Sequence, residues 1–119
     1  MTSDAGAVRT TLAPAAALFR SLGDPVRLGI VQRLAVGEAR VADLVAQLGL
    51  AQSTVSAHLA CLRDCGLVES RPVGRASVFR LTRPELQDLL RAGETLLSAT
   101  GAAVRLCPRY GDDSCSTAG

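Results

Sequence analysis

The chain has 119 residues, a formal net charge of +2, and a composition that is 48% hydrophobic but only 3% aromatic. This length suits one domain, and the lack of Trp favours packed helices built from Leu, Val, Ile and Ala over a β-sandwich. No stretch approaches the run of about 18 apolar residues that spans a membrane, and the N-terminus lacks the basic start of a signal peptide. We therefore expect a cytoplasmic protein that does not contact a membrane.

The charge is distributed unevenly along the chain. All 13 basic residues are Arg, which phosphate contact would favour, although codon bias in a GC-rich genome is the preferred explanation for the missing Lys. Residues 50–83 carry five Arg against two acidic residues, net +3, whereas residues 84–119 carry three Arg against five acidic residues, net −2. The positive charge is therefore concentrated in one segment, as contact with nucleic acid requires.

The first third of the chain predicts an arm and two helices. Residues 1–10 are small and polar, and we expect a flexible N-terminal arm. A first helix is predicted over about 12–22, and a second begins at Asp24-Pro25, because Asp accepts N-cap hydrogen bonds and Pro suits the first helical position. Gly37 is predicted to end the second helix. The first helix is indicated by apolar residues at helical spacing: Leu12, Ala16, Phe19 and Leu22.

The middle of the chain predicts a helix-turn-helix followed by a hairpin. A third helix near 40–48 ends at Gly49, and a fourth buries the stripe Val55, Leu59 and Leu62. Such a unit places its second helix in a DNA major groove. Segments 67–71 and 77–81 then predict two strands around a turn at 72–75, with Arg75 at the tip.

The last third predicts a capped helix and a tail. Thr82 to Glu85 form a capping-box pattern, and a Leu-rich helix follows over 84–100. Because no apolar partner for this helix is left within the chain, we expect it to pair with a second copy. We expect residues 11–100 to form a winged helix-turn-helix domain with dimerisation helices, and residues 101–119 a flexible, Cys-containing tail. The predicted fold is mainly α with a small β-hairpin, in a homodimer.

Two cysteines stand four residues apart on the predicted DNA-reading helix. This spacing places Cys61 and Cys65 on one helical face with Cβ atoms roughly 5 to 6 Å apart, too far for a disulfide between them. Two thiolates on adjacent turns can instead share one soft metal ion. In a reducing compartment the four cysteines are better explained as free thiols, metal ligands or redox sensors than as a disulfide framework.

Several motifs in order resemble the ArsR/SmtB family of bacterial metal-sensing repressors over about residues 15–100. The resemblance implies a dimeric winged helix-turn-helix that binds an operator, expected to be an inverted repeat, and releases it when metal binds. One departure is Ala51, where many members have a capping Ser or Thr, which weakens helix entry by about 1 kcal/mol unless Ser53 compensates. The matching motifs are Phe19-Arg20-Ser21-Leu22-Gly23-Asp24-Pro25-Val26-Arg27-Leu28, Ser53-Thr54-Val55-Ser56-Ala57-His58-Leu59, Gly66-Leu67-Val68 and Gly74-Arg75.

The family's metal sites differ between members, and one type matches here. Residues 38–43 lack the Cys motif of arsenic and cadmium sensors, and residues 84–100 lack the His of the zinc site. The string Cys61-Leu62-Arg63-Asp64-Cys65-Gly66-Leu67-Val68 resembles the CmtR type of cadmium and lead sensor, whose tail supplies a third cysteine. The resemblance implies Cys61, Cys65 and Cys107 as ligands, with Cys115 as a further candidate. Cd(II) or Pb(II) is the expected inducer, with As(III) or Zn(II) possible and no organic cofactor.

His58 has two interpretations. It lies three residues before Cys61 and can be a metal ligand, or it faces DNA from the first turns of the helix. Arg63 and Arg75 likewise suit phosphate contacts or simple solvated positions. The residues expected to contact double-stranded DNA are Gln52, Ser53, Thr54, Ser56, Ala57, His58, Arg63 and Arg75.

The main rival function is a thiol redox or persulfide sensor on the same fold, pairing Cys107 with Cys61 or Cys65. An enzyme is not expected, because the chain has one His, no phosphate-binding Gly loop after a strand and no Cys-x-x-Cys pair. A DNA-binding protein without an effector would leave the cysteine spacing unexplained.

Overall fold

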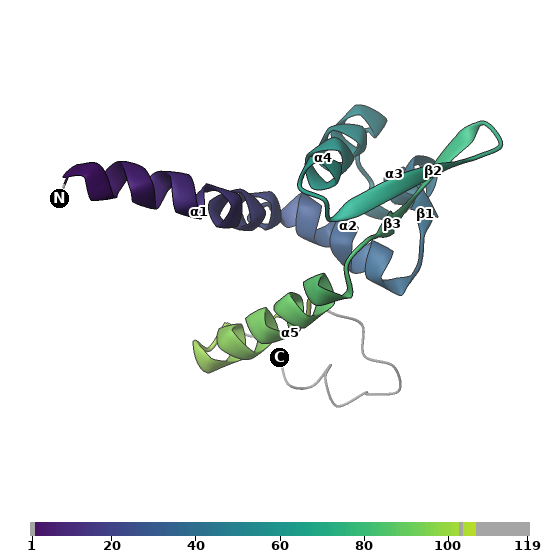
Figure 1. Ribbon diagram of the computed structural model, residues 1–119. Coiled ribbons are helices and arrows are strands. Elements are labelled where there is room, and N and C mark those ends of the chain that lie inside the picture. The colour runs from purple at the N-terminus through teal and green to yellow at the C-terminus, as the bar shows by residue number, and fades with distance from the viewer. Residues whose placement is uncertain (1, 103, 107–119) are drawn as a thin grey trace.

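The computed structural model describes residues 2–102 and 104–106, which form five helices and three short strands (Figure 1). The elements in chain order are α1 (Thr2–Leu22), α2 (Pro25–Val36), β1 (Ala39–Arg40), α3 (Val41–Leu48), α4 (Gln52–Asp64), β2 (Val68–Val73), β3 (Ala76–Leu81) and α5 (Pro84–Ala99). This mainly helical arrangement with a small sheet confirms the predicted fold class. None of the helices in the described part of the chain has the length and apolar character that a membrane span needs.

The core lies where α2, α3 and α4 meet the sheet. Leu44 of α3 and the predicted stripe of α4 are almost completely buried, with Val55, Leu59 and Leu62 all at 1% exposure or less. Ile30 and Val31 of α2 pack in the same cluster. The helix-turn-helix therefore rests on aliphatic packing, as the composition predicted.

The ends of α2 and α3 form as their residues predict. The carboxylate of Asp24 accepts hydrogen bonds from the backbone N–H groups of Val26 and Arg27 at 2.9 and 3.0 Å, and Pro25 occupies the first turn. Gly37 is the C-cap of α2. Gly49 ends α3 in the left-handed conformation with φ 69°, which glycine adopts without a Cβ penalty.

The sheet has the order β1-β3-β2 and is antiparallel throughout. β2 and β3 form the predicted hairpin in full register from Val68 opposite Leu81 to Val73 opposite Ala76, with a turn at Gly74 (φ 61°) and Arg75. β1 was not predicted, because two residues carry no periodicity. It adds the buried side chain of Ala39 opposite Phe79 and ties the start of α3 to the hairpin, which we call the wing.

Helix α1 is longer than the sequence indicates. It begins at Thr2 instead of about residue 12, so residues 2–10 are helical and continue through Pro14. The described side chains before Ala17 are all exposed, and α1 projects from the body of the domain (Figure 1). Two of its predicted apolar positions, Leu12 and Phe19, are 54% and 59% exposed. Leu22, the last predicted position, is buried at 8% exposure, so the stripe is covered at its C-terminal end and left uncovered at Leu12 and Phe19.

The predicted capping box of α5 is wrong. Arg83 is the N-cap and makes no side-chain cap hydrogen bond. The Thr82 hydroxyl instead donates to the carbonyl of Gly66 at 2.6 Å, so it holds the end of the wing against the end of α4.

The chain after α5 turns back onto the domain, where a flexible tail from residue 101 was expected. Leu106 is 9% exposed in the core cluster, and its backbone N–H donates to the buried carboxylate of Glu94. The Gln32 amide of α2 donates to the carbonyl of Arg105 at 2.6 Å. Residues 104–106 are thus fixed to both α5 and α2. Cys107 and Cys115 lie outside the described residues.

Candidate thiol site and nucleic-acid interface

The outer face of α4 carries most of the side chains predicted to contact DNA. Ala51 is the N-cap of α4 and supplies no side-chain hydrogen bond, so backbone N–H groups of the first turn are left for solvent or an anion. The exposed side chains of this face are those of Gln52, Ser53, Thr54, Ser56, Ala57 and Arg63. They share the surface that a groove-binding helix must present, and their contact with DNA stays a prediction.

His58 occupies a different environment from the other predicted DNA contacts. Its side chain is 20% exposed, and its Nδ1 accepts from the Arg27 Nη1 at 3.1 Å, because a guanidinium can only donate. Its Nε2 lies 3.9 Å from the Asp24 carboxylate. The hydrogen bonds from the backbone N–H groups of Arg27 and Val26, together with the charge of the Arg27 guanidinium, hold the pKa of Asp24 below its ordinary value. His58 therefore links α4 to the start of α2.

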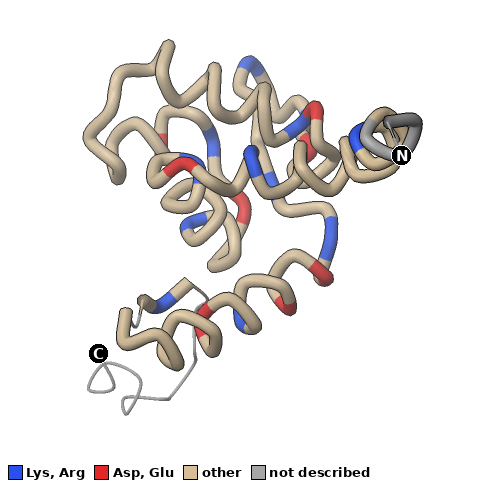
Figure 2. The backbone as a smooth tube through the Cα atoms, turned by 90° about the vertical axis from the view of Figure 1, so that its left-hand side faces the viewer, with Lys and Arg blue, Asp and Glu red and all other residues tan. Residues whose placement is uncertain are grey.

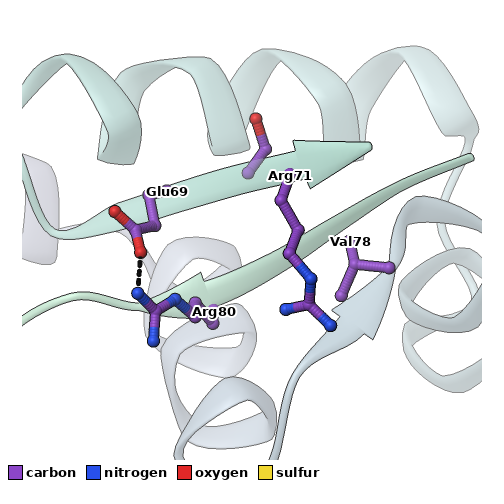
Figure 3. Close-up of a pocket in the computed structure, with 5 residues that line it drawn as sticks. Glu69, Arg71, Val78 and Arg80 are labelled. Carbon is purple, nitrogen blue, oxygen red and sulfur yellow. Dashed lines mark ion pairs between the residues drawn. The ribbon is translucent and has the colours of Figure 1, made fainter. Parts of the chain in front are cut away.

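Two of the Arg residues on the wing are held by carboxylates. Arg71 of β2 donates both Nη atoms to Glu38, at 2.5 and 2.6 Å, and Arg80 of β3 pairs with Glu69. Figure 3 shows Arg71 and Arg80 reaching over the outer face of the hairpin, where they line a hollow of about 330 Å³ with Glu69 and Val78. The Arg71 hydrogen bonds lower the pKa of Glu38, and Glu38 raises the pKa of Arg71. Both Arg charges are therefore largely compensated.

Because Arg71 and Arg80 are paired with carboxylates, the positive charge of residues 50–83 is less concentrated in the folded domain than in the sequence. Arg positions alternate with Asp and Glu positions through the body of the domain (Figure 2). Arg75, at the tip of the wing, and Arg63, near the end of α4, are exposed and make no ion pair with any residue that the structure describes. These two remain the cations best placed to meet a phosphate.

The predicted thiol pair lies at the end of α4, facing α1. Cys61 is in the last turn, and Cys65 is the C-cap, whose backbone N–H still donates to the carbonyl of Cys61 at 3.2 Å. Both thiols are free and partly buried. The Ser21 hydroxyl at the end of α1 lies 2.7 Å from Cys65 Sγ and 3.8 Å from Cys61 Sγ. One oxygen therefore contacts both sulfurs.

A groove between α1 and α4 opens onto the thiols. It encloses about 420 Å³ and is floored by small side chains of both helices, with Arg20, Arg27 and Asp64 at its rim. It is large enough for a metal ion and further ligands. Within residues 2–102 and 104–106, no group of three or more His, Cys, Asp or Glu side chains is arranged to hold a metal. Two sulfurs are thus in place, and any third ligand must come from elsewhere.

Sequence reasoning found the thiols but missed Ser21 and Arg27. Both belong to the motif from Phe19 to Leu28, where they look like ordinary helix residues. Arg27 Nε donates to the Ser21 carbonyl at 2.6 Å, and Arg27 Nη2 donates to the Arg20 carbonyl at 3.3 Å. The only available signal was an Arg five residues after the end of α1, which can satisfy the carbonyls at that end.

Comparison with known proteins agrees with this geometry. Residues 24–70 match the model of the family described as "Bacterial regulatory protein, arsR family". The chain is 37% identical over 94 residues to a probable mercury resistance operon repressor of Streptomyces lividans, covering 79% of this chain and 75% of that protein. It is 44% identical over 71 residues to the HTH-type transcriptional regulator CmtR of Mycobacterium tuberculosis, covering 60% of each.

A solved structure has the same fold. The homodimeric winged helix-turn-helix DNA-binding domain of a possible ArsR-family transcriptional regulator from Mycobacterium bovis superposes with a TM-score of 0.69 at 28% identity. The match covers 75% of this chain and 82% of that one.

Proposed function

This chain belongs to the ArsR family of bacterial regulatory proteins, and on that premise we propose that it is a homodimeric repressor released from its operator by a soft, thiophilic metal ion. It is a winged helix-turn-helix regulator of transcription and not an enzyme. The observation that carries the proposal is the pair of free thiols, Cys61 and Cys65, opening into one groove on the DNA-reading helix itself.

The donor set favours soft ions. Thiolate sulfur prefers Cd(II), Pb(II) and As(III), and Zn(II) would need a fourth ligand. Two relatives support this class of ligand: the probable mercury resistance operon repressor and the regulator CmtR. We propose Cd(II) or Pb(II) as the inducer, in the manner of the CmtR type.

We further propose that Cys107 completes the site from the other protomer. Residue 106 is anchored beside Gly93 and Glu94 of α5, and Arg105 contacts α2. In Figure 1, α4 and α5 lie on opposite sides of α2, so the anchored segment and the thiol groove are separated within one chain. We therefore assign the third thiolate of this proposal to the partner's tail.

The dimer is proposed to form through α1 and α5. The large apolar side chains exposed on these helices and just beyond them have no cover within the described protomer, and they are Val8, Leu12, Phe19, Leu96 and Val104. A groove of about 320 Å³ lined by Leu18, Leu86 and Leu89 runs between the same two helices. The homodimeric state of the neighbour from Mycobacterium bovis supports a dimer.

Metal and DNA are coupled in this proposal. If bound metal lowers the affinity of the protein for DNA by some factor, bound operator lowers the affinity for the metal by the same factor. A coupling of about 1 to 3 kcal/mol lowers DNA affinity roughly 5- to 150-fold. Since the thiols lie on α4 and next to α1, the ion acts directly on the contact between the reading helix and a dimerisation helix.

The function is tested by titrating the reduced protein with Cd(II) under anaerobic conditions. A fluorescein-labelled duplex, selected in vitro by the metal-free protein, reports DNA binding by anisotropy, while ultraviolet absorption follows cadmium–thiolate bonds. We expect stoichiometric absorption together with DNA release. DNA binding that ignores Cd(II) and responds to diamide or polysulfide would contradict the proposal in favour of the thiol redox sensor.

The wing gives a second test. Arg75→Ala should make the salt dependence of DNA affinity shallower by about two units of slope, because the proposed homodimer loses one phosphate contact from each protomer. Arg71→Ala is the matched control, since that guanidinium is already held by Glu38 and should change the slope less. Equal slopes for Arg75→Ala and the wild type would remove Arg75 from the interface.

A further inference from the structure

Ser21 is the one side chain in the described residues that makes hydrogen bonds to the predicted metal ligands. Its hydroxyl lies 2.7 Å from Cys65 Sγ and 3.8 Å from Cys61 Sγ, and the residue is 3% exposed. A buried hydroxyl between two sulfurs is shielded from competing water. It is also separated from them by 40 and 44 residues in sequence, so the contact is a product of the fold.

The backbone of Ser21 is held independently of its side chain. Arg27 donates to the carbonyls of Ser21 and Arg20, at 2.6 and 3.3 Å, and the same guanidinium donates to His58 of α4 at 3.1 Å. The end of α1 is therefore tied to α4 twice, once through the Ser21 hydroxyl and the thiols, and once through Arg27 and His58. Changing the hydroxyl alone leaves the second connection intact.

We propose that Ser21 is a positioning residue of the thiol site, whose hydroxyl donates its one proton to the metal-bound sulfur of Cys65, the nearer of the two sulfurs. This inference rests on the metal-responsive function proposed above. When the ion binds, two S–H bonds break, two protons pass to solvent, and two S–metal bonds form, with no change of oxidation state. The sulfurs can then only accept, and the Ser21 O–H is a donor already in place.

This hydrogen bond has two consequences. It orients the Cys65 thiolate toward an ion shared with Cys61, as outer partners do in other metal sites, where their loss typically costs 10- to 100-fold in metal affinity. It also connects the occupied site to α1, so that movement of the sulfurs toward the ion is transmitted to a proposed dimerisation helix. Ser21 therefore contributes both to affinity for the ion and to release of DNA.

The test compares full-length Ser21→Ala, Ser21→Thr and the wild type. Cd(II) affinity is measured by chelator competition in reduced protein, and the cadmium–thiolate absorption band is recorded. Ser98→Ala is the matched control, because Ser98 is exposed on α5. The metal-free variants must bind the selected DNA duplex as the wild type does, which verifies their folding.

We expect Ser21→Ala to bind Cd(II) about 10- to 100-fold more weakly, with unchanged stoichiometry. Its absorption band should move to longer wavelength, because a thiolate without a hydrogen bond is oxidised more easily. Ser21→Thr, which keeps the hydroxyl, should restore both properties. Wild-type affinity and band position in Ser21→Ala would overturn the role of Ser21 and leave the metal-responsive repressor standing. Absence of cadmium–thiolate absorption in the wild type would overturn both.

Discussion

Replacing Cys61 by Ser should abolish the release of DNA by Cd(II), so that a change of roughly 5- to 150-fold in the wild type falls to about onefold. A serine hydroxyl is a hard, protonated oxygen at neutral pH and does not replace a thiolate for a soft ion. The side chain is only partly buried and lies outside the stripe of Val55, Leu59 and Leu62, so the domain should fold normally.

The measurement is DNA anisotropy at increasing Cd(II), with wild type and Cys61→Ser in parallel. Equal DNA affinity of the two metal-free proteins is the control for folding. If Cys61→Ser protein released DNA at the same Cd(II) concentration as the wild type, the switch would have to lie elsewhere in the chain.

The same variant locates the third ligand. Heterodimers of Cys61→Ser and Cys107→Ser subunits retain one complete site if each site combines Cys61 and Cys65 of one protomer with Cys107 of the other. They retain none if all three cysteines come from one chain. Recovery of half of the wild-type cadmium–thiolate absorption would support the site between subunits, and no recovery would contradict it.

Phe19→Glu should convert the protein to monomers at micromolar concentration. Phe19 is 59% exposed on α1, and the two-fold axis of a dimer would bring two introduced charges into one apolar interface. An unpaired carboxylate there costs on the order of 3 kcal/mol, or roughly 100-fold in the dimer dissociation constant. Operator affinity should fall with it, because one protomer contacts only one half-site.

Light scattering of Phe19→Glu and Val36→Glu separates the interface from general effects of charge. Val36 is 60% exposed at the end of α2, a helix outside the proposed interface, and its substitution should leave a dimer. Dimers of normal stability in Phe19→Glu would show that α1 does not form the interface that we propose.

The elements predicted correctly from the sequence are those whose signals are local. Asp24 with Pro25 starts α2, Gly49 ends α3, and Gly74 turns the hairpin, because each effect depends on one or two neighbouring residues. The core stripe of α4 follows from helical periodicity alone.

What could not be predicted depends on contacts between distant segments. The two-residue strand β1 forms because Ala39 pairs with Phe79 of β3. The chain turns back after α5 because the Leu106 backbone N–H donates to the Glu94 carboxylate. The capping-box prediction was wrong because the Thr82 hydroxyl donates to the Gly66 carbonyl instead. At the site, the cysteine spacing is visible in one helical turn, whereas Ser21 reaches the thiols only after α1 and α4 pack.

The double hydrogen bond between Arg71 and Glu38 links two distant segments of the protomer. Glu38 lies just before β1 and α3, while Arg71 lies on β2, so this pair and the three-stranded sheet brace the wing against the helix-turn-helix. The wing and α4 are therefore joined within one protomer. In the proposed dimer, we expect an effector bound near α1 to change the spacing and tilt between the two protomers more than the position of the wing relative to α4.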